Sequence, residues 1–173
     1  MTIRRAEDAD LAALAGLARR TYADAFGHSF SPSDLAAHLE RNLADSYFRQ
    51  AMAEDVFLLA EAAGRLIGFV QFGPVRIAVA AASPQDQELR RIYVLADFQN
   101  RGIGRRLMDA ALDHPRLRAA DIYLDVWEQN HIARRLYERY GFTVIGAHGL
   151  VTASGLAQDQ DLIMVRRQSR ITF

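Results

Sequence analysis

The chain has 173 residues, half of them apolar, and its 21 basic side chains balance 21 acidic ones. This length suffices for one hydrophobic core, so we expect a single domain over residues 1–173. The zero net charge argues against a nucleic-acid partner, and the absence of cysteine excludes disulfides, thiolate metal sites and cysteine nucleophiles.

The N-terminal region turns acidic before any apolar run develops, which is unlike a signal peptide. No run of about 18 apolar residues is present to span a membrane. We therefore expect a cytoplasmic protein with no membrane partner. The five histidines show no paired spacing of the kind that metal ligands have, so no metal is expected.

The first third of the chain is predicted to be a strand followed by helices. Asp8 can cap a helix whose apolar residues recur at helical spacing. Ser31 followed by Pro32 is a typical helix start. The expected elements are a strand at 2–5 and helices at 11–23, 32–42 and 46–53.

The rest of the chain is predicted to be mostly sheet. Apolar runs on either side of Gly64 predict an antiparallel hairpin at 56–62 and 66–72. Residues 75–87 begin apolar and end polar, which predicts a strand remnant followed by a surface loop. Further strands are expected at 88–94, 122–126, 143–150 and 162–167, with helices at 104–114 and 130–140.

A glycine-containing segment, Gln99-Asn100-Arg101-Gly102-Ile103-Gly104, lies between an expected strand and an expected helix. Backbone N–H groups at a helix start lack carbonyl partners, and the helix dipole adds positive charge, so the segment can bind a pyrophosphate. Glycine allows phosphate oxygens to approach the backbone closely. Arg101, Arg105 and Arg106 add positive charge nearby.

Spacing separates this segment from two other nucleotide motifs. A dinucleotide-binding fingerprint needs a third glycine where Leu107 stands, and a P-loop needs Lys-Ser/Thr where Arg105 and Arg106 follow Gly104. Taken alone, a two-glycine pattern is more often a tight turn with solvated arginines.

The segment resembles the coenzyme A loop of GNAT acetyltransferases, in which Gln/Arg-x-x-Gly-x-Gly/Ala follows a central strand. Gln99, Gly102 and Gly104 match this pattern. The family's second motif follows as Leu124-Asp125-Val126-Trp127-Glu128-Gln129-Asn130, then Ala133, Leu136-Tyr137 and Gly141-Phe142.

The resemblance implies the α/β (α+β) GNAT acyl-CoA N-acyltransferase fold: a mixed, mostly antiparallel sheet, splayed at its centre and flanked by helices. It also implies an N-acetyltransferase with acetyl-CoA as cosubstrate and with no covalent enzyme intermediate. A backbone N–H around Val94 is then the oxyanion donor. The implied coenzyme-binding residues are Ile92, Tyr93, Val94, Gln99, Asn100, Arg101, Gly102, Ile103, Gly104, Arg105, Asn130 and Ala133.

Asn130 and Tyr137 are seven residues apart, so on a helix they share a face about 10 Å long. In the family that the resemblance implies, the asparagine helps to hold the coenzyme and the tyrosine protonates the leaving thiolate. The alternative for Tyr137 is a core aromatic, because Ala133, Leu136 and Tyr140 complete an apolar stripe with it.

Glu88 matches a position at which several GNAT enzymes carry a glutamate base, and it is the candidate for deprotonating the amine. An exposed carboxylate at a strand edge is an equally good interpretation. Arg90 lies two residues on, on the same face of the expected strand, where its charge would weaken a base.

A closer resemblance, to bacterial spermidine/spermine N-acetyltransferases of the PaiA type, extends over nearly the whole chain. The departures from it are residues 75–87, Arg90 where an acidic residue is usual, and an insertion-like stretch at 152–160. The matching stretches are Thr21-Tyr22-Ala23-Asp24-Ala25-Phe26, Ser31-Pro32 with Leu39-Glu40, Arg91-Ile92-Tyr93-Val94, Val126-Trp127-Glu128 with Asn130, Gly146-Ala147-His148 and Asp161-Leu162-Ile163-Met164.

This resemblance implies a polyamine acceptor such as spermidine or spermine. Its substrate-binding residues would be Asp24, Glu40, Trp127 and His148, and Asp34 is a further carboxylate on the same helices. Open alternatives are a non-catalytic acyl-CoA binding module and an enzyme that acetylates a peptide N-terminus or another small amine. The expected assembly is a monomer or a homodimer.

Overall fold

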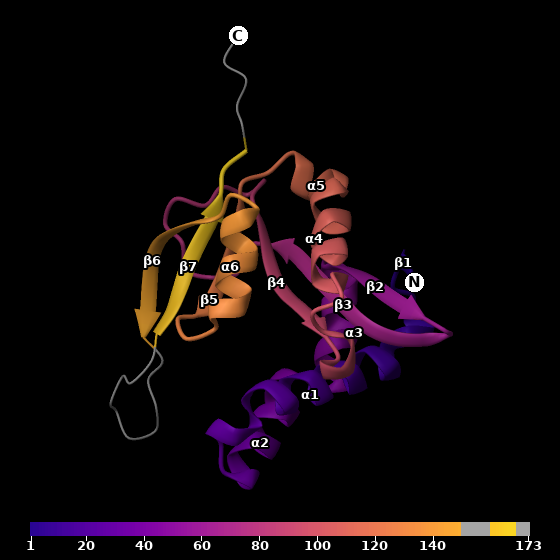
Figure 1. Ribbon diagram of the computed structural model, residues 1–173. Coiled ribbons are helices and arrows are strands. Elements are labelled where there is room, and N and C mark those ends of the chain that lie inside the picture. Colours follow the sequence, from indigo (N-terminus) through magenta and orange to yellow (C-terminus); the bar gives the residue numbers. More distant parts are fainter. Residues whose placement is uncertain (150–159, 169–173) are drawn as a thin grey trace. The chain divides into compact units, whose positions relative to one another are not determined.

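A computed structural model describes residues 1–149 and 160–168 (Figure 1). It contains a seven-stranded sheet with the strand order β1-β2-β3-β4-β5-β7-β6. The chain folds into two compact units. Unit 1 contains Met1–Phe72 and Arg91–Ala111, and unit 2 contains Gly73–Arg90 and Leu112–Phe173.

Unit 1 begins as the sequence predicts, with a strand and three helices before the hairpin. Strand β2 pairs antiparallel with both β1 and β3. The hairpin turn consists of Ala63 and Gly64, both with positive φ, as a tight two-residue connection requires. The elements are β1 (Thr2–Arg5), α1 (Leu11–Phe26), α2 (Pro32–Asn42), α3 (Asp45–Glu54), β2 (Val56–Ala62), β3 (Arg65–Pro74) and α4 (Ile103–Asp113), and the last two residues of β3 and of α4 belong to unit 2.

The core of unit 1 lies between the helices α1 and α3 and one face of β2 and β3. Leu14 and Ala18, four residues apart on α1, are fully buried against Phe48, Phe57 and Phe69. The opposite face of β3 meets α4, because a Cβ added at Gly68 would lie 3.4 Å from the Leu107 side chain. The sheet of this unit is therefore covered by helices on both faces.

Strand β4 (Gln87–Val94) runs from unit 2 into unit 1. In unit 2 it pairs in parallel with β5 at Gln87↔Ile122 and Glu88↔Tyr123. In unit 1 it is followed by a bond from the Leu95 N–H to the Ile67 carbonyl, 3.0 Å long, beside β3. The expected splay at the centre of the sheet stays a prediction.

Unit 2 is built on three antiparallel strands, with β7 between β5 and β6. Tyr123, Leu124 and Met164 are fully buried in it. Arg166 on β7 donates to the Tyr140 carbonyl at the end of α6. The elements are α5 (Pro115–Arg118), β5 (Ile122–Trp127), α6 (His131–Arg139), β6 (Thr143–Gly149) and β7 (Gln160–Arg166).

Three sequence predictions about these elements are wrong in detail. The chain forms no strand after Pro74 until β4 begins at Gln87, so the expected strand remnant is loop. Helix α1 continues to Phe26, and Asp8 lies in a short turn before it rather than at its cap. Helix α5 was not predicted, because four residues leave no periodicity to detect. Leu150 and the stretch 152–159 lie outside the described residues.

Among the described residues, none of the helices combines the length and the apolar character that crossing a membrane requires.

Candidate functional site

The glycine loop connects β4 to α4 in unit 1, as predicted. Its first residue, Gln99, donates from its side-chain amide to the Val94 carbonyl over 3.0 Å, which ties the loop to the end of β4. Asn100 and Gly102 have positive φ values of 59° and 76°. Two left-handed residues turn the chain sharply, and residues 99–102 of the loop are all exposed.

Space remains around both glycines of the loop. A Cβ added at Gly102 or Gly104 would meet no heavy atom within 4 Å. Helix α4 starts here, with the Arg106 N–H bonded to the Gly102 carbonyl at 3.0 Å, and Ile103 anchors this start in the core. Its first-turn N–H groups precede any intrahelical acceptor. The residues present therefore fit a pyrophosphate, which needs open space over backbone donors.

The end of β4 lies very close to β3. A Cβ at Gly68 would lie 2.7 Å from the Tyr93 carbonyl and 3.3 Å from the Val94 side chain, so only glycine fits at that position. The Tyr93 ring packs against Phe69 at 5.4 Å between centroids. Burial raises the pKa of the Tyr93 phenol, and the nearby Arg91 offsets part of that rise.

Glu88 is buried and surrounded by donors. Its Oε2 accepts from the backbone N–H groups of Arg76 and Ile77 at 2.6 and 3.0 Å, and its Oε1 pairs with Arg90 at 2.6 Å. Arg90 also donates to the Pro74 carbonyl. The interpretation of Glu88 as an exposed carboxylate is therefore wrong. Its role as the base stays a prediction, which three donors around the carboxylate disfavour because a base needs access to a substrate proton. The expected contact with Arg90 is confirmed.

Asn130 and Tyr137 lie at the start and near the end of α6 in unit 2. Asn130 is the N-cap, and its side-chain oxygen accepts from the Ala133 N–H at 3.2 Å. Tyr137 is buried, 9% exposed, with its ring 5.8 Å from that of Phe142. The tyrosine thus has the packing of a core aromatic, which leaves its catalytic role a prediction.

Asp125, His148 and Asp161 come together on one face of the sheet of unit 2. His148 Nε2 lies 3.7 Å from an Asp125 oxygen and 3.9 Å from an Asp161 oxygen, and all three ligand-type atoms lie within 4.8 Å of one another. Trp127 is the cross-strand partner of Asp161, so it lies on the same face. This carboxylate–histidine group could hold an ammonium group or a metal ion.

The sequence analysis names His148 and the neighbouring Trp127 as substrate-binding residues, but it misses Asp125 and Asp161, because the members of the group come from three strands. The pairing registers place Trp127 and His148 opposite Asp161, and Asp125 lies two residues before Trp127 on the same face of β5. Spacing along the chain therefore could not reveal the two carboxylates as neighbours of His148.

The carboxylates expected on the first helices are on the surface. Asp24 is exposed and lies 3.8 Å from Arg20, one turn earlier on α1. Asp34 is used at the start of α2, where it accepts from the Ser31 hydroxyl at 2.6 Å. Glu40 is exposed on α2.

A polar network beneath the helices of unit 1 was not foreseen either. Arg91 on β4 donates to the Tyr47 hydroxyl at 2.6 Å and to the Gln71 side chain at 2.7 Å. Gln71 is fully buried and also donates to Asp55 at 2.7 Å. Since the network joins α3, β3 and β4, no single periodic pattern marks it.

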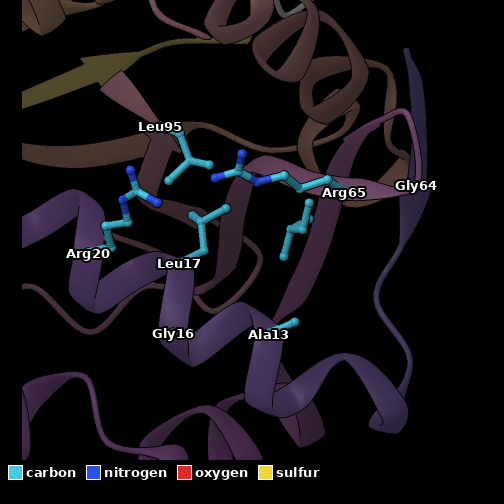
Figure 2. A pocket seen from close by; sticks show the side chains of 8 residues that line it. Ala13, Gly16, Leu17, Arg20, Gly64, Arg65 and Leu95 are labelled. Carbon is cyan, nitrogen blue, oxygen red and sulfur yellow. The ribbon is translucent and has the colours of Figure 1, made fainter. Parts of the chain in front are cut away.

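A cavity of about 380 Å³ lies between α1 and the β2–β3 turn of unit 1 (Figure 2). Arg20 and Arg65 are the charged residues that line it. The cavity is otherwise lined by Ala13, Gly16, Leu17, Gly64, Leu66 and Leu95.

Comparison with known proteins gives concordant results. The model of a family described as "Acetyltransferase (GNAT) family" matches residues 18–142. An uncharacterized N-acetyltransferase in the pepI 3' region of Lactobacillus delbrueckii subsp. lactis is 28% identical over 152 residues, covering 86% of this chain and 88% of that protein. The uncharacterized N-acetyltransferase YhfO of Bacillus subtilis is 32% identical over 152 residues, covering 82% and 89%.

Two solved structures show the same fold. The PaiA N-acetyltransferase of Thermoplasma acidophilum, crystallised with coenzyme A, superposes with a TM-score of 0.73 at 21% identity and covers 96% of this chain and 98% of that one. The ribosomal-protein-S18-alanine N-acetyltransferase of Escherichia coli has a TM-score of 0.69 at 21% identity and covers 99% of both chains.

Proposed function

Because the chain belongs to the GNAT acetyltransferase family, we propose that it transfers the acetyl group of acetyl-CoA to a primary amine of a small molecule. The observation that carries the proposal is the glycine loop. Its two glycines leave open space above the start of α4, where unpaired N–H groups can bind the pyrophosphate of the cosubstrate. Arg101 and Arg105, both exposed, add positive charge at the same place.

The reaction is a direct transfer. The amine nitrogen attacks the thioester carbonyl, the new C–N bond forms as the C–S bond breaks, and coenzyme A leaves as a thiol. The amine must first lose a proton, since an alkylammonium with a pKa near 10.4 is only about one part in a thousand neutral near pH 7. The surroundings of Glu88 favour a structural role, so we assign this deprotonation to solvent or to another side chain.

Tyr137 is the proposed proton donor to the leaving thiolate. A phenol with an ordinary pKa near 10 can protonate a thiolate whose conjugate acid has a pKa near 8.5. Burial of the ring beside Phe142 would hold the phenol in one orientation. The backbone N–H near Val94 remains the proposed oxyanion donor, which its position at the end of β4 supports.

The finer proposal for the acceptor is a polyamine such as spermidine or spermine. It is supported by the resemblance to the PaiA type and by the carboxylate–histidine group of Asp125, His148 and Asp161. Two carboxylates within 4.8 Å of one another can bind an ammonium group. Trp127 on the same face could add a cation–π contact. Asp24 and Glu40, both exposed, receive no comparable support.

The test is turnover of acetyl-CoA by the purified chain, followed as free thiol, with spermidine, spermine, a monoamine of similar length and a peptide N-terminus. The proposal expects thiol release with amines and the highest kcat/KM for the polyamines. A preference for the peptide, or equal rates with spermidine and the monoamine, would contradict the polyamine assignment alone. Acetyl-CoA binding without thiol release from any amine would instead indicate a non-catalytic acyl-CoA binding module.

A further inference from the structure

Three arginines surround the short turn Ala96–Phe98 between β4 and the glycine loop. Arg101, in the loop itself, places its guanidinium carbon 5.5 Å from the centroid of the Phe98 ring. Arg65, at the start of β3, lies 5.9 Å from the same ring. Arg20 on α1 lies 4.0 Å from Asp97. Positive charge therefore continues from the glycine loop over Phe98 to the cavity beneath α1.

That cavity has apolar walls and two cationic side chains. Arg20 and Arg65 extend over it from opposite sides toward Leu95 (Figure 2). The cavity lining contains no carboxylate. The volume of about 380 Å³ is space that the lining side chains leave empty, so a ligand group can enter between the two arginines.

The two arginines differ in how their charge is balanced. Arg20 has carboxylates nearby, at 3.8 Å in Asp24 and 4.0 Å in Asp97, but both are solvent-exposed pairs of the weak kind. Arg65 forms no ion pair with any described residue, and its side chain contacts the Phe98 ring. A guanidinium that is held over an aromatic ring, with no carboxylate paired to the N–H donors along its edges, is suited to bind a phosphate.

We propose that this cavity is the subsite for the 3′-phosphate on the adenosine ribose of the coenzyme, with Arg65 as its principal ligand and Arg20 as the second. The inference rests on the proposed function, because it takes the pyrophosphate to lie at the glycine loop. In coenzyme A, one ribose carries both the pyrophosphate and the 3′-phosphate. In the protein, Arg101 of the glycine loop and Arg65 of the cavity both contact the ring of Phe98.

Coenzyme A and dephospho-coenzyme A differ only in this phosphate, which makes the test direct. Calorimetric titration of the wild type should show that coenzyme A binds at least about tenfold more tightly than dephospho-coenzyme A. The reason is that dephospho-coenzyme A lacks the doubly charged phosphate that the cationic site would bind. In Arg65→Gln the preference should fall below about threefold, through weaker binding of coenzyme A alone. Arg20→Gln should reduce the preference by a smaller factor.

The matched control is Arg5→Gln, another exposed arginine of unit 1, on β1. It should keep the full preference, and all three variants should unfold at the wild-type temperature. Equal binding of the two coenzymes by the wild type, or an equal loss for both in Arg65→Gln, would overturn the 3′-phosphate assignment. Inorganic phosphate should also compete with coenzyme A more effectively in the wild type than in Arg65→Gln. Equal competition in the two proteins would count against the assignment.

The outcome is separable from that of the proposed function. If neither coenzyme binds the wild type, the glycine loop is not a coenzyme site and the proposed function itself fails. If both bind with the same affinity in every variant, the proposed function survives and only this subsite is wrong.

Discussion

The glycine loop and Glu88 both match functional positions of the family in sequence, yet their surroundings are opposite. Space for a Cβ is open at Gly102 and Gly104. The Glu88 carboxylate is buried, with two backbone N–H donors and Arg90 around it. A buried group whose hydrogen bonds are already made within the fold has little capacity left for a ligand. The comparison teaches that a residue at a motif position indicates function when the fold leaves space beside it for a ligand.

Accessibility to a ligand also separates the α6 residues Asn130 and Tyr137 from the carboxylate–histidine group in unit 2. Tyr137 is buried against Phe142, and the side-chain oxygen of Asn130 already caps α6. The side chains of the carboxylate–histidine group are partly exposed, at 41% for His148, 35% for Asp125 and 21% for Asp161. In its exposure this group therefore resembles the glycine loop. Tyr137 is buried like Glu88 but is still a proposed catalytic residue, so its substitution is the sharper test of the criterion.

The largest expected effect is the loss of stability in Glu88→Gln. Removing the charge breaks the buried pair of Glu88 with Arg90, and breaking a buried pair costs about 3 kcal/mol or more. Thermal unfolding should shift down by roughly 6 °C or more. Activity per folded molecule should stay near that of the wild type.

The control for this variant is Glu138→Gln in the same unit, where a half-exposed carboxylate lies 4.0 Å from Arg134. Its stability should change by at most about 0.5 kcal/mol. Unchanged stability of Glu88→Gln together with a large fall in kcat would restore Glu88 as the catalytic base.

Tyr137→Phe should lower kcat by about 100-fold while acetyl-CoA affinity stays within about twofold, because only the proton donor is removed. Steady-state thiol release and calorimetry measure the two quantities. Tyr140→Phe, three residues on in the C-cap of α6, is the matched control and should behave as the wild type. If kcat also stays at the wild-type value in Tyr137→Phe, the tyrosine is a core aromatic and nothing more.

His148→Gln should raise KM for spermidine by roughly three- to tenfold, because one of three acceptors around the ammonium group is changed. KM for a monoamine and the affinity for acetyl-CoA should not move. His131→Gln, at an exposed position on α6, serves as the control. An equal rise of KM for both amines would argue that the group does not select a second charge.

The smallest effect concerns His38 in unit 1, whose ring stacks on Tyr22 at 4.4 Å. Burial lowers its pKa, and the charges of Arg41 and Arg91 lower it further. The unfolded chain therefore takes up this proton first as the pH falls, so stability is lost below about pH 6.5. The unfolding temperature should fall between about pH 7.5 and about pH 5.5.

In His38→Gln that fall should be shallower, whereas His28→Gln, an exposed histidine in the turn after α1, should keep it. A fall of the same size in all three proteins would show that other groups set the acid response.

Local patterns were enough to predict most elements of the fold. Ser31 and Pro32 marked the start of α2 because capping and a fixed φ act within one turn. Gly64 marked the hairpin because a two-residue turn requires positive φ. The loop after Pro74 was wrongly predicted to begin as a strand. Its first residues are largely apolar, but they form no strand in the structure.

The site was predictable only where its parts are contiguous in sequence. The glycine loop satisfies this condition, and its open space agrees with the prediction. The donors to Glu88 come from Arg76 and Ile77, more than ten residues upstream and in a segment without a pattern. The grouping of Asp125 with His148 depends on strand registers, which are properties of the folded sheet.

The most direct test of the account is calorimetric titration of acetyl-CoA into the wild type and Gly102→Asp. A carboxylate and a Cβ at this left-handed position would occupy the open space over the start of α4. We expect affinity to fall at least about tenfold. Gly102 is exposed, so the folded state should persist. Wild-type affinity in this variant would contradict the assignment of the glycine loop to the coenzyme.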